Sequence, residues 1–296
     1  MHAVFEVLKA ILYGIVEGIT EWLPISSTGH LILVEDWLPF AFTKDPTFAV
    51  EFWEMFQVVI QLGAILAVVV LFWEKLWPFS KKKNNEQKRN TWRLWLRVIV
   101  ASLPAAFAGI VIDEVLEALT SKDIDGWLYN STVVAVALIV YGVAFVLIER
   151  VNKNKTARVG SLEELSFGTA LCIGAFQALS IVPGTSRSGS TILGSMLMGV
   201  SRTTAAEFSF FMAFPVMVGA SGIKALGFLS YVGEASVSVP EMAWVTLAVG
   251  CIVSFAVSML AIRFLMDFVK KHSFAPFGVY RIVLGVIVLL LGLLRG

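Results

Sequence analysis

The sequence contains little cysteine, little histidine and little charge. Its 296 residues include two cysteines and three histidines, and 15% of the residues are charged. Cys172 and Cys251 each lie inside an apolar stretch without a C-x-x-C or Cys/His pattern, which argues against redox and zinc chemistry. The net charge is only +1, so the chain has no global basic field for a nucleic-acid partner, and we expect none.

Apolar side chains dominate instead, at 57% of the residues. Soluble domains average about 45–50% even when glycine is counted as apolar. A helix needs about 20 apolar residues to cross the hydrocarbon layer. Six stretches approach that length: 51–73, 94–112, 130–148, 204–228, 242–262 and 279–294. The sequence therefore predicts an all-α polytopic membrane protein with six transmembrane helices.

Two further apolar segments, 5–34 and 167–199, are interrupted by polar runs rich in proline and glycine. The runs are Pro24-Ile-Ser-Ser-Thr-Gly-His30 and Pro183-Gly-Thr-Ser-Arg-Ser-Gly-Ser-Thr191. Such runs break helices at membrane depth, where irregular backbone survives only if protein shields it or if it lines a polar cavity. We therefore expect the chemistry of the protein at these two breaks.

Lysine and arginine are distributed unevenly among the connections. Stretches 74–97, 149–166 and 263–281 hold eight, four and four of the 23 basic residues, whereas 35–54, 113–127 and 224–241 hold one each. The positive-inside rule places the first three in the cytoplasm and the last three outside. Segment 167–199 must then begin and end on the cytoplasmic face, which predicts a re-entrant helical hairpin.

The two halves of the chain resemble each other at a shift of about 156–159 residues. Glu17-Gly-Ile-Thr-Glu-Trp-Leu-Pro24 is echoed by Gln177-Ala-Leu-Ser-Ile-Val-Pro183. Each half, 1–150 and 151–296, would contain one re-entrant hairpin and three spans, and an odd number of crossings predicts an inverted-topology repeat. Hairpin 5–34 would then enter from outside and meet hairpin 167–199 near the bilayer midplane.

Two carboxylates precede the first break. Glu17 and Glu21 are four residues apart, so on a helix they share one face. Carboxylates in an apolar segment are costly to bury and are functional by default. A structural ion pair with Arg187 is the alternative interpretation.

One imidazole and three hydroxyl groups lie within the first break itself. His30 follows Ser26, Ser27 and Thr28, and together they provide the parts of a hydroxyl nucleophile activated by a base. Hydroxyl groups in such a position also cap helices, so this cluster taken alone is a weak signal.

The second break predicts a loop that leads into a helix and binds phosphate. Gly184 and Gly189 allow the backbone to turn its amides inward, a helix N-terminus is positive, and Arg187 offers bidentate hydrogen bonds. A Ser/Gly-rich surface for helix packing is the alternative. The predicted diphosphate ligands from both breaks are Ser26, Thr28, Gly184, Thr185, Ser186, Arg187, Ser188 and Gly189.

These two motifs resemble those of the undecaprenyl-diphosphate phosphatase family, also called bacitracin-resistance proteins. The resemblance extends across nearly the whole chain, including Glu207-Phe-Ser-Phe and Phe274-Ala-Pro-Phe-Gly-Val-Tyr-Arg281. It implies a multi-pass enzyme of the bacterial inner membrane that removes the terminal phosphate of undecaprenyl diphosphate. Such an enzyme recycles the lipid carrier of cell-wall synthesis and confers bacitracin resistance. Its active site would open to the periplasmic or extracellular side.

The resulting hypothesis assigns catalytic roles to Glu17, Glu21, Ser27, His30 and Arg187. Ser27 would attack phosphorus or position an attacking water, while Glu21 and His30 would handle protons in an order that the sequence leaves open. Carboxylates repel a diphosphate unless a cation intervenes, so Mg²⁺ or Ca²⁺ is an expected cofactor. Glu17 and Glu21 are its candidate ligands.

Two alternative functions would need different features, and the oligomeric state is a separate question. Membrane phosphatases of the phosphatidic-acid type use a histidine nucleophile a few residues after a Ser-Arg motif, but no histidine follows Arg187 until His272. A secondary transporter or lipid-phosphate translocase would use the same midplane anion site. The Gly-rich spans are compatible with a homodimer as well as with packing inside one chain.

Overall fold

The computed structural model of the protein describes residues 2–120, 128 and 130–295. Within these ranges the chain is helical and contains no β-strand, only an isolated bridge between Val159 and Val200. Six helices are long and apolar enough to cross a membrane: α3 (Pro46–Leu71), α5 (Asn85–Thr120), α7 (Ser131–Asn152), α10 (Arg202–Glu234), α11 (Glu241–Lys271) and α12 (Ala275–Arg295). The predicted all-α polytopic membrane fold is confirmed.

Several of these helices extend beyond the predicted spans. Helix α11 continues to Lys271, and α5 begins at Asn85 and runs to Thr120. Hydropathy marks only the part of a helix that suits hydrocarbon, whereas the backbone hydrogen bonds continue through charged residues at its ends. The beginning of the predicted outer loop 113–127 is therefore helical, and its residues 121–127 lie outside the described residues.

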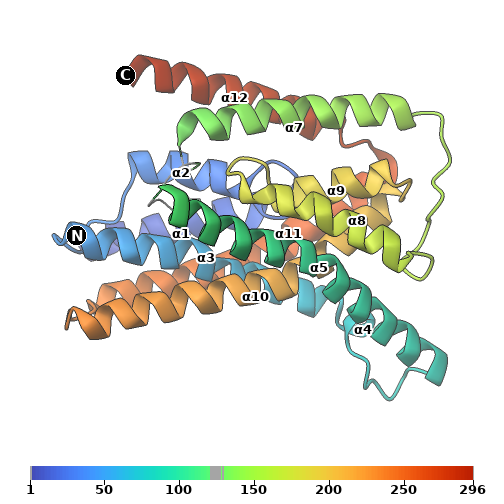
Figure 1. The fold of residues 1–296 in the computed structure, drawn as a ribbon. Coiled ribbons are helices and arrows are strands. Elements are labelled where there is room, and N and C mark those ends of the chain that lie inside the picture. The colour runs from blue at the N-terminus through green and yellow to red at the C-terminus, as the bar shows by residue number, and fades with distance from the viewer. Residues whose placement is uncertain (1, 121–127, 129, 296) are drawn as a thin grey trace.

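The two interrupted segments form pairs of short helices. The first pair is α1 (His2–Thr20) with α2 (Ser27–Trp37), and the second is α8 (Phe167–Ala178), the 3₁₀ turn η1 (Leu179–Ile181) and α9 (Arg187–Leu197). None of these helices is among the six spans. Figure 1 shows the first pair reaching into the bundle from the end that holds the N-terminus and the second pair from the opposite end. That each pair returns to the same membrane face stays a prediction.

The irregular backbone at each break is shorter than the polar run in the sequence. Helix α2 already begins at Ser27 and α9 at Arg187, so the second half of each run forms a first helical turn. Ser26 and Ser186 cap these helices, which is why helical structure resumes within the run.

The spans and broken pairs pack in matching combinations. Helix α1 packs against α11 as α8 packs against α5, while α3 packs against α10 and α7 against α12. Glycines permit the closest approaches: a Cβ on Gly18 would lie 2.9 Å from the carbonyl oxygen of Ser254, and one on Gly174 would lie 2.1 Å from that of Ala101. These combinations are what an exchange of the two halves would produce, but the division at residue 150 and the inversion stay predictions.

Large apolar side chains lie on the outside of the bundle as well as inside it. Phe208, Phe210 and Phe211 are fully buried in the core. Phe107 and Ile223, in contrast, are 70% and 73% exposed. A soluble monomer rarely exposes so much apolar surface, and here that surface suits contact with lipid.

A short helix, α4 (Trp73–Leu76), connects α3 to the loop before α5.

Candidate active site

The two breaks share an unusual backbone conformation. Ser26 has φ = 76° and Ser186 has φ = 69°, both in the left-handed region that residues other than glycine rarely adopt. The side chain of each serine then caps the next helix: Ser26 Oγ accepts from the amide of Gly29 at 3.3 Å, and Ser186 Oγ from that of Gly189 at 3.1 Å. Such conformations cost on the order of 1–3 kcal/mol each and cluster at functional sites.

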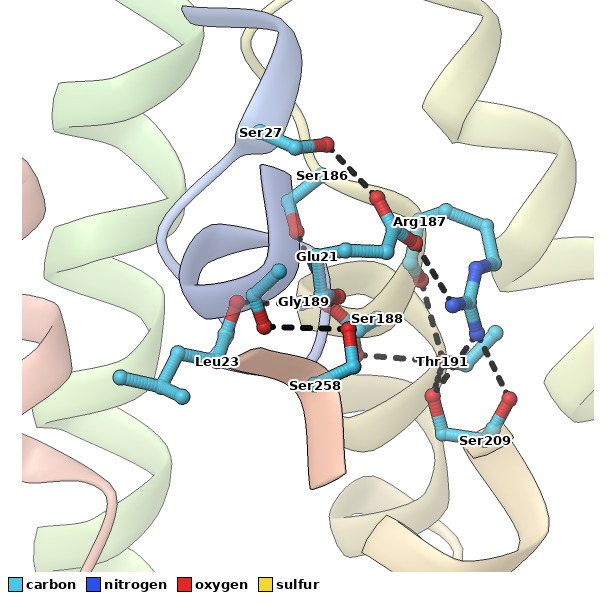
Figure 2. Close-up of polar contacts among 11 residues, drawn as sticks. Glu21, Leu23, Ser27, Ser186, Arg187, Ser188, Gly189, Thr191, Ser209 and Ser258 are labelled. Atoms are coloured by element: carbon cyan, nitrogen blue, oxygen red, sulfur yellow. Dashed lines mark hydrogen bonds and ion pairs between the residues drawn. The ribbon is translucent and has the colours of Figure 1, made fainter. Parts of the chain in front are cut away.

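Arg187 from the second break contacts Glu21 from the first (Figure 2). Arg187 Nη2 donates to Glu21 Oε1 at 2.8 Å, and Ser27 Oγ donates to Glu21 Oε2 at 2.7 Å. Both side chains of the ion pair are at least nine-tenths buried. The two breaks therefore meet at one carboxylate, which links the serine hydroxyl to the guanidinium. The same contact is the structural ion pair that the sequence left as an alternative.

The other side of the Arg187 guanidinium faces α10. Its Nη1 donates to the carbonyl oxygen of Ser209 at 2.6 Å and lies 3.3 Å from the hydroxyl of the same residue. That hydroxyl is 2.7 Å from Thr191 Oγ1 (Figure 2). The guanidinium carbon of Arg187 also lies over the Trp22 ring, 5.9 Å from its centre. Sequence reasoning missed Ser209, although a hydroxyl within a span is a signal of a polar interior.

Ser188 connects the backbones of the two breaks. Its hydroxyl donates to the carbonyl oxygen of Glu21 at 3.0 Å and lies 3.2 Å from Ser186 Oγ. This predicted diphosphate ligand is therefore engaged within the protein. The first turn of α9 still presents backbone amides that helix geometry leaves without carbonyl partners, as an anion site requires.

His30 points toward α12 rather than toward Ser27. Its Nδ1 lies 2.6 Å from the carbonyl oxygen of Ser26, and its Nε2 lies 2.7 Å from the hydroxyl of Tyr280. Because a carbonyl oxygen only accepts, Nδ1 carries a proton, and in the neutral ring Nε2 accepts from Tyr280. Within the described part of the chain, the Ser27 hydroxyl thus bonds to Glu21 and not to the imidazole.

Glu17 is buried beside this cluster without a hydrogen-bonding partner. It is 0% exposed, and neither carboxylate oxygen has a partner among the described residues. Its counterpart in the second half, Gln177, is equally buried and its amide is equally unpartnered there. A buried, unpaired carboxylate costs several kcal/mol unless it is protonated or binds a cation.

The residues around Glu17 are suited to a metal ion only if the substrate completes its coordination. Over residues 2–120, 128 and 130–295, no group of three or more His, Cys, Asp or Glu side chains could hold a metal. Mg²⁺, however, commonly binds one or two carboxylates together with substrate phosphates. The unpartnered oxygens of Glu17 fit that donor set, whereas both oxygens of Glu21 already have partners.

The remaining predicted ligands occupy two places. Thr28 lines a cavity of about 660 Å³ between α2, α3 and α10. Gly184 has φ = +88°, and a Cβ there would lie 2.5 Å from the carbonyl oxygen of Val134. The carbonyl oxygens of Gly184 and Thr185 both accept hydrogen bonds from Arg281. These two residues therefore bind a guanidinium through their carbonyls, while only their neighbours present groups suited to an anion.

Arg281 corrects one sequence-based interpretation. Its charge was counted with the cytoplasmic loop 263–281, but the residue lies inside α12 and is 0% exposed. The count alone could not separate a loop arginine from one on the first turns of the following helix. An arginine directly before an apolar run would have been the available signal.

Comparisons with known proteins identify the family of the chain. A family model described as bacitracin resistance protein BacA matches residues 10–287. The undecaprenyl-diphosphatase of Enterococcus faecalis is 50% identical over 288 residues, which cover 97% of either chain. That of Acetivibrio thermocellus is 50% identical over 285 residues, or 96% of this chain and 97% of the relative. Undecaprenyl-diphosphatase 1 of Clostridioides difficile is 48% identical over 287 residues, or 97% and 96%. The chain belongs to the bacitracin resistance protein BacA family.

Proposed function

We propose that this protein is an integral membrane phosphatase that hydrolyses undecaprenyl diphosphate to undecaprenyl phosphate and inorganic phosphate. The contact chain from Ser27 through Glu21 to Arg187 carries this assignment, because it joins a nucleophile, a base and a phosphate-binding cation. Family membership supports the same substrate. In the cell the reaction would recycle the lipid carrier of cell-wall synthesis and confer bacitracin resistance.

The proposed reaction begins at the Ser27 hydroxyl. Glu21 accepts the hydroxyl proton as Ser27 Oγ attacks the terminal phosphorus, and the bond from that phosphorus to the bridging oxygen breaks. Undecaprenyl phosphate leaves, and water then hydrolyses the phosphoserine to inorganic phosphate. In the alternative route Ser27 orients a water that attacks directly. Arg187 would bind the equatorial oxygens, where charge accumulates in the transition state.

His30 is the second proton carrier in this proposal. Because the Ser27 hydroxyl already bonds to Glu21, the imidazole remains for the leaving oxygen or for the water of the second step. The diphosphate would bind at Ser26, Thr28 and the 184–189 turn.

A divalent cation, Mg²⁺ or Ca²⁺, is part of the proposal because of the charge balance. Glu17 and Glu21 are buried carboxylates beside the site, and they would repel the negative charge of a diphosphate unless a cation intervenes. Glu17 would hold the ion together with the phosphates, and Glu21 is a second candidate ligand. The ion would neutralise phosphate oxygens during the transfer.

We further propose that the site opens to the outer face of the bacterial inner membrane. The cavity beside Thr28 supports this orientation, because it is also lined by Glu54 and Lys224, near the ends of α3 and α10 that the charge count places outside.

A homodimer is also proposed. On α10, a Cβ at Gly219, Gly222 or Gly227 would meet nothing within 4 Å, which leaves room for a second helix.

The test is release of inorganic phosphate from undecaprenyl diphosphate by the purified protein in detergent. We expect turnover by the wild type and a large loss in Glu21→Gln and Arg187→Ala. Arg202→Gln is the matched control, because it removes an ion pair with Glu149 outside the site. Normal turnover by Glu21→Gln and Arg187→Ala would remove these residues from the chemistry. Transport of lipid phosphate in proteoliposomes without hydrolysis would instead favour a translocase.

A further inference from the structure

Arg281 is a fully buried cation that contacts both breaks. Its Nη1 donates to the carbonyl oxygen of Pro24 in the first break at 3.2 Å. Its Nη2 donates to the carbonyl oxygens of Gly184 and Thr185 in the second, at 2.8 and 2.9 Å. The guanidinium carbon also lies 5.5 Å from the ring centre of Tyr141. One side chain from α12 therefore fixes the spacing between two backbone segments that are about 160 residues apart.

These contacts lie directly beside the capped turns at Ser26 and Ser186. A Cβ on Gly189 would be only 3.1 Å from Arg281 Nη1 and 3.2 Å from Ser186 Cβ. The glycine thus lets the first turn of α9 lie on the guanidinium. The carbonyls that accept from Arg281 belong to residues one or two positions before Ser26 and Ser186, the residues held at positive φ. Any movement of Arg281 would move the two turns relative to each other.

The charge of Arg281 has no anionic partner in the part of the chain that the structure describes. Among the described residues no carboxylate forms a salt bridge with it, and its Nε is buried without a hydrogen-bond acceptor. Carbonyl oxygens accept hydrogen bonds from Nη1 and Nη2 but leave the net charge in place. A buried charge without a counterion is expensive, so such a site gains most when an anion binds nearby. Arg187 differs, because Glu21 already neutralises it.

We propose that Arg281 is a positioning residue for the diphosphate. It holds the Ser26 and Ser186 turns at the separation needed for one anion to contact both, and its uncompensated charge favours that anion through the intervening backbone. The idea depends on the proposed function for the identity of the substrate. It does not depend on catalysis, because an anion should bind by the same means whether or not it is hydrolysed.

A purely structural role predicts a different result from substitution. Arg281→Lys keeps the charge but loses the fork that reaches three carbonyls, whereas Arg281→Gln keeps an amide donor and loses the charge. If Arg281 only holds the fold together, anion binding should follow stability in both variants. If its charge acts on the diphosphate, Lys should restore binding that Gln does not, even where the two variants unfold at similar temperatures.

The experiment measures binding of inorganic pyrophosphate with Mg²⁺ by calorimetry, using the full-length protein in detergent. We expect Arg281→Gln to bind pyrophosphate about tenfold more weakly or worse, and Arg281→Lys to fall between it and the wild type. KM for undecaprenyl diphosphate should rise more than kcat falls. Thermal unfolding without ligand gives the stability of each variant, and Arg202→Gln controls for the loss of a remote arginine.

Two outcomes overturn the proposal. Arg281→Gln could bind pyrophosphate as tightly as the wild type, or Gln and Lys could weaken binding equally and in proportion to their loss of stability. Failure of the proposed function would look different, since the wild type would then release no phosphate while still binding pyrophosphate through Arg281.

Discussion

The rings of Tyr280 and His30 lie nearly parallel, with their centres 5.7 Å apart, their planes inclined by 3° and the phenol hydroxyl 2.7 Å from Nε2. The two residues are 250 positions apart, and their contact connects the last helix to the first break. Through it, α12 fixes the orientation of the imidazole, while the carbonyl oxygen of Ser26 determines which nitrogen bears the proton.

Removing the Tyr280 hydroxyl should slow turnover without disturbing the fold. Tyr280→Phe keeps the ring that stacks on His30 but loses one hydrogen bond, worth about 1 kcal/mol, so we expect kcat to fall roughly fivefold. Steady-state phosphate release measures the kcat of the Tyr280→Phe variant. Tyr231→Phe, at the far end of α10, is the control. An unchanged kcat in Tyr280→Phe would show that the orientation of His30 does not limit the reaction.

The identity of the nucleophile can be decided by trapping. If Ser27 attacks, rapid acid quenching during turnover should yield a phosphoserine at Ser27, which mass spectrometry of peptides would locate. Glu21→Gln should then form it about 10²–10⁴-fold more slowly, because the base is lost. If the Ser27→Ala variant retains most of its activity, direct attack by water would be established instead.

Glu17 should determine how much divalent cation the reaction needs. Chelation with EDTA is expected to abolish phosphate release, and added Mg²⁺ or Ca²⁺ to restore it. In Glu17→Gln, the Mg²⁺ concentration for half-maximal activity should rise, because the unpartnered carboxylate is gone. Glu6→Gln is the comparison, since Glu6 pairs with Lys9 outside the site. Full activity in EDTA would exclude the cation from the mechanism.

The capped turn at Ser186 can be tested with a pair of substitutions. Ser186→Ala removes the cap while keeping a Cβ at positive φ, so we expect a loss of about 0.5–2 kcal/mol in the free energy of unfolding. Ser186→Gly also removes the cap but relieves the backbone strain, so its loss should be only a few tenths of a kcal/mol. Denaturant unfolding in detergent measures both. Equal losses would mean that the strain is negligible.

Hydropathy and charge were enough to predict the architecture. Six spans follow from the length of the apolar runs, and the two breaks follow from Pro24 and Pro183 with their polar neighbours. The sidedness of the basic loops led to two opposed hairpins, and this arrangement predicted that Arg187 lies close to Glu21 across 166 residues. In the structure Arg187 Nη2 lies 2.8 Å from Glu21 Oε1. These features depend on solvation of whole segments, which the sequence records directly.

The partners of individual side chains could not be predicted in the same way. Arg281 and Tyr280 lie near the start of α12, and their local sequence does not indicate which groups of the two breaks they contact. Likewise, whether the Ser27 hydroxyl would bond to Glu21 or to His30 depends on the turn at Ser26. Contacts of this kind arise from tertiary packing, which fixes rotamers after the helices have been placed.

The two capped turns have the same backbone but different residues directly after the strained serine. In one the next residue is Ser27, and in the other it is Arg187. Two similar turns thus present a hydroxyl from one break and a cation from the other. A ligand with two phosphoryl groups bound between these turns would meet unlike groups at its two ends, which would favour attack on one phosphorus over the other.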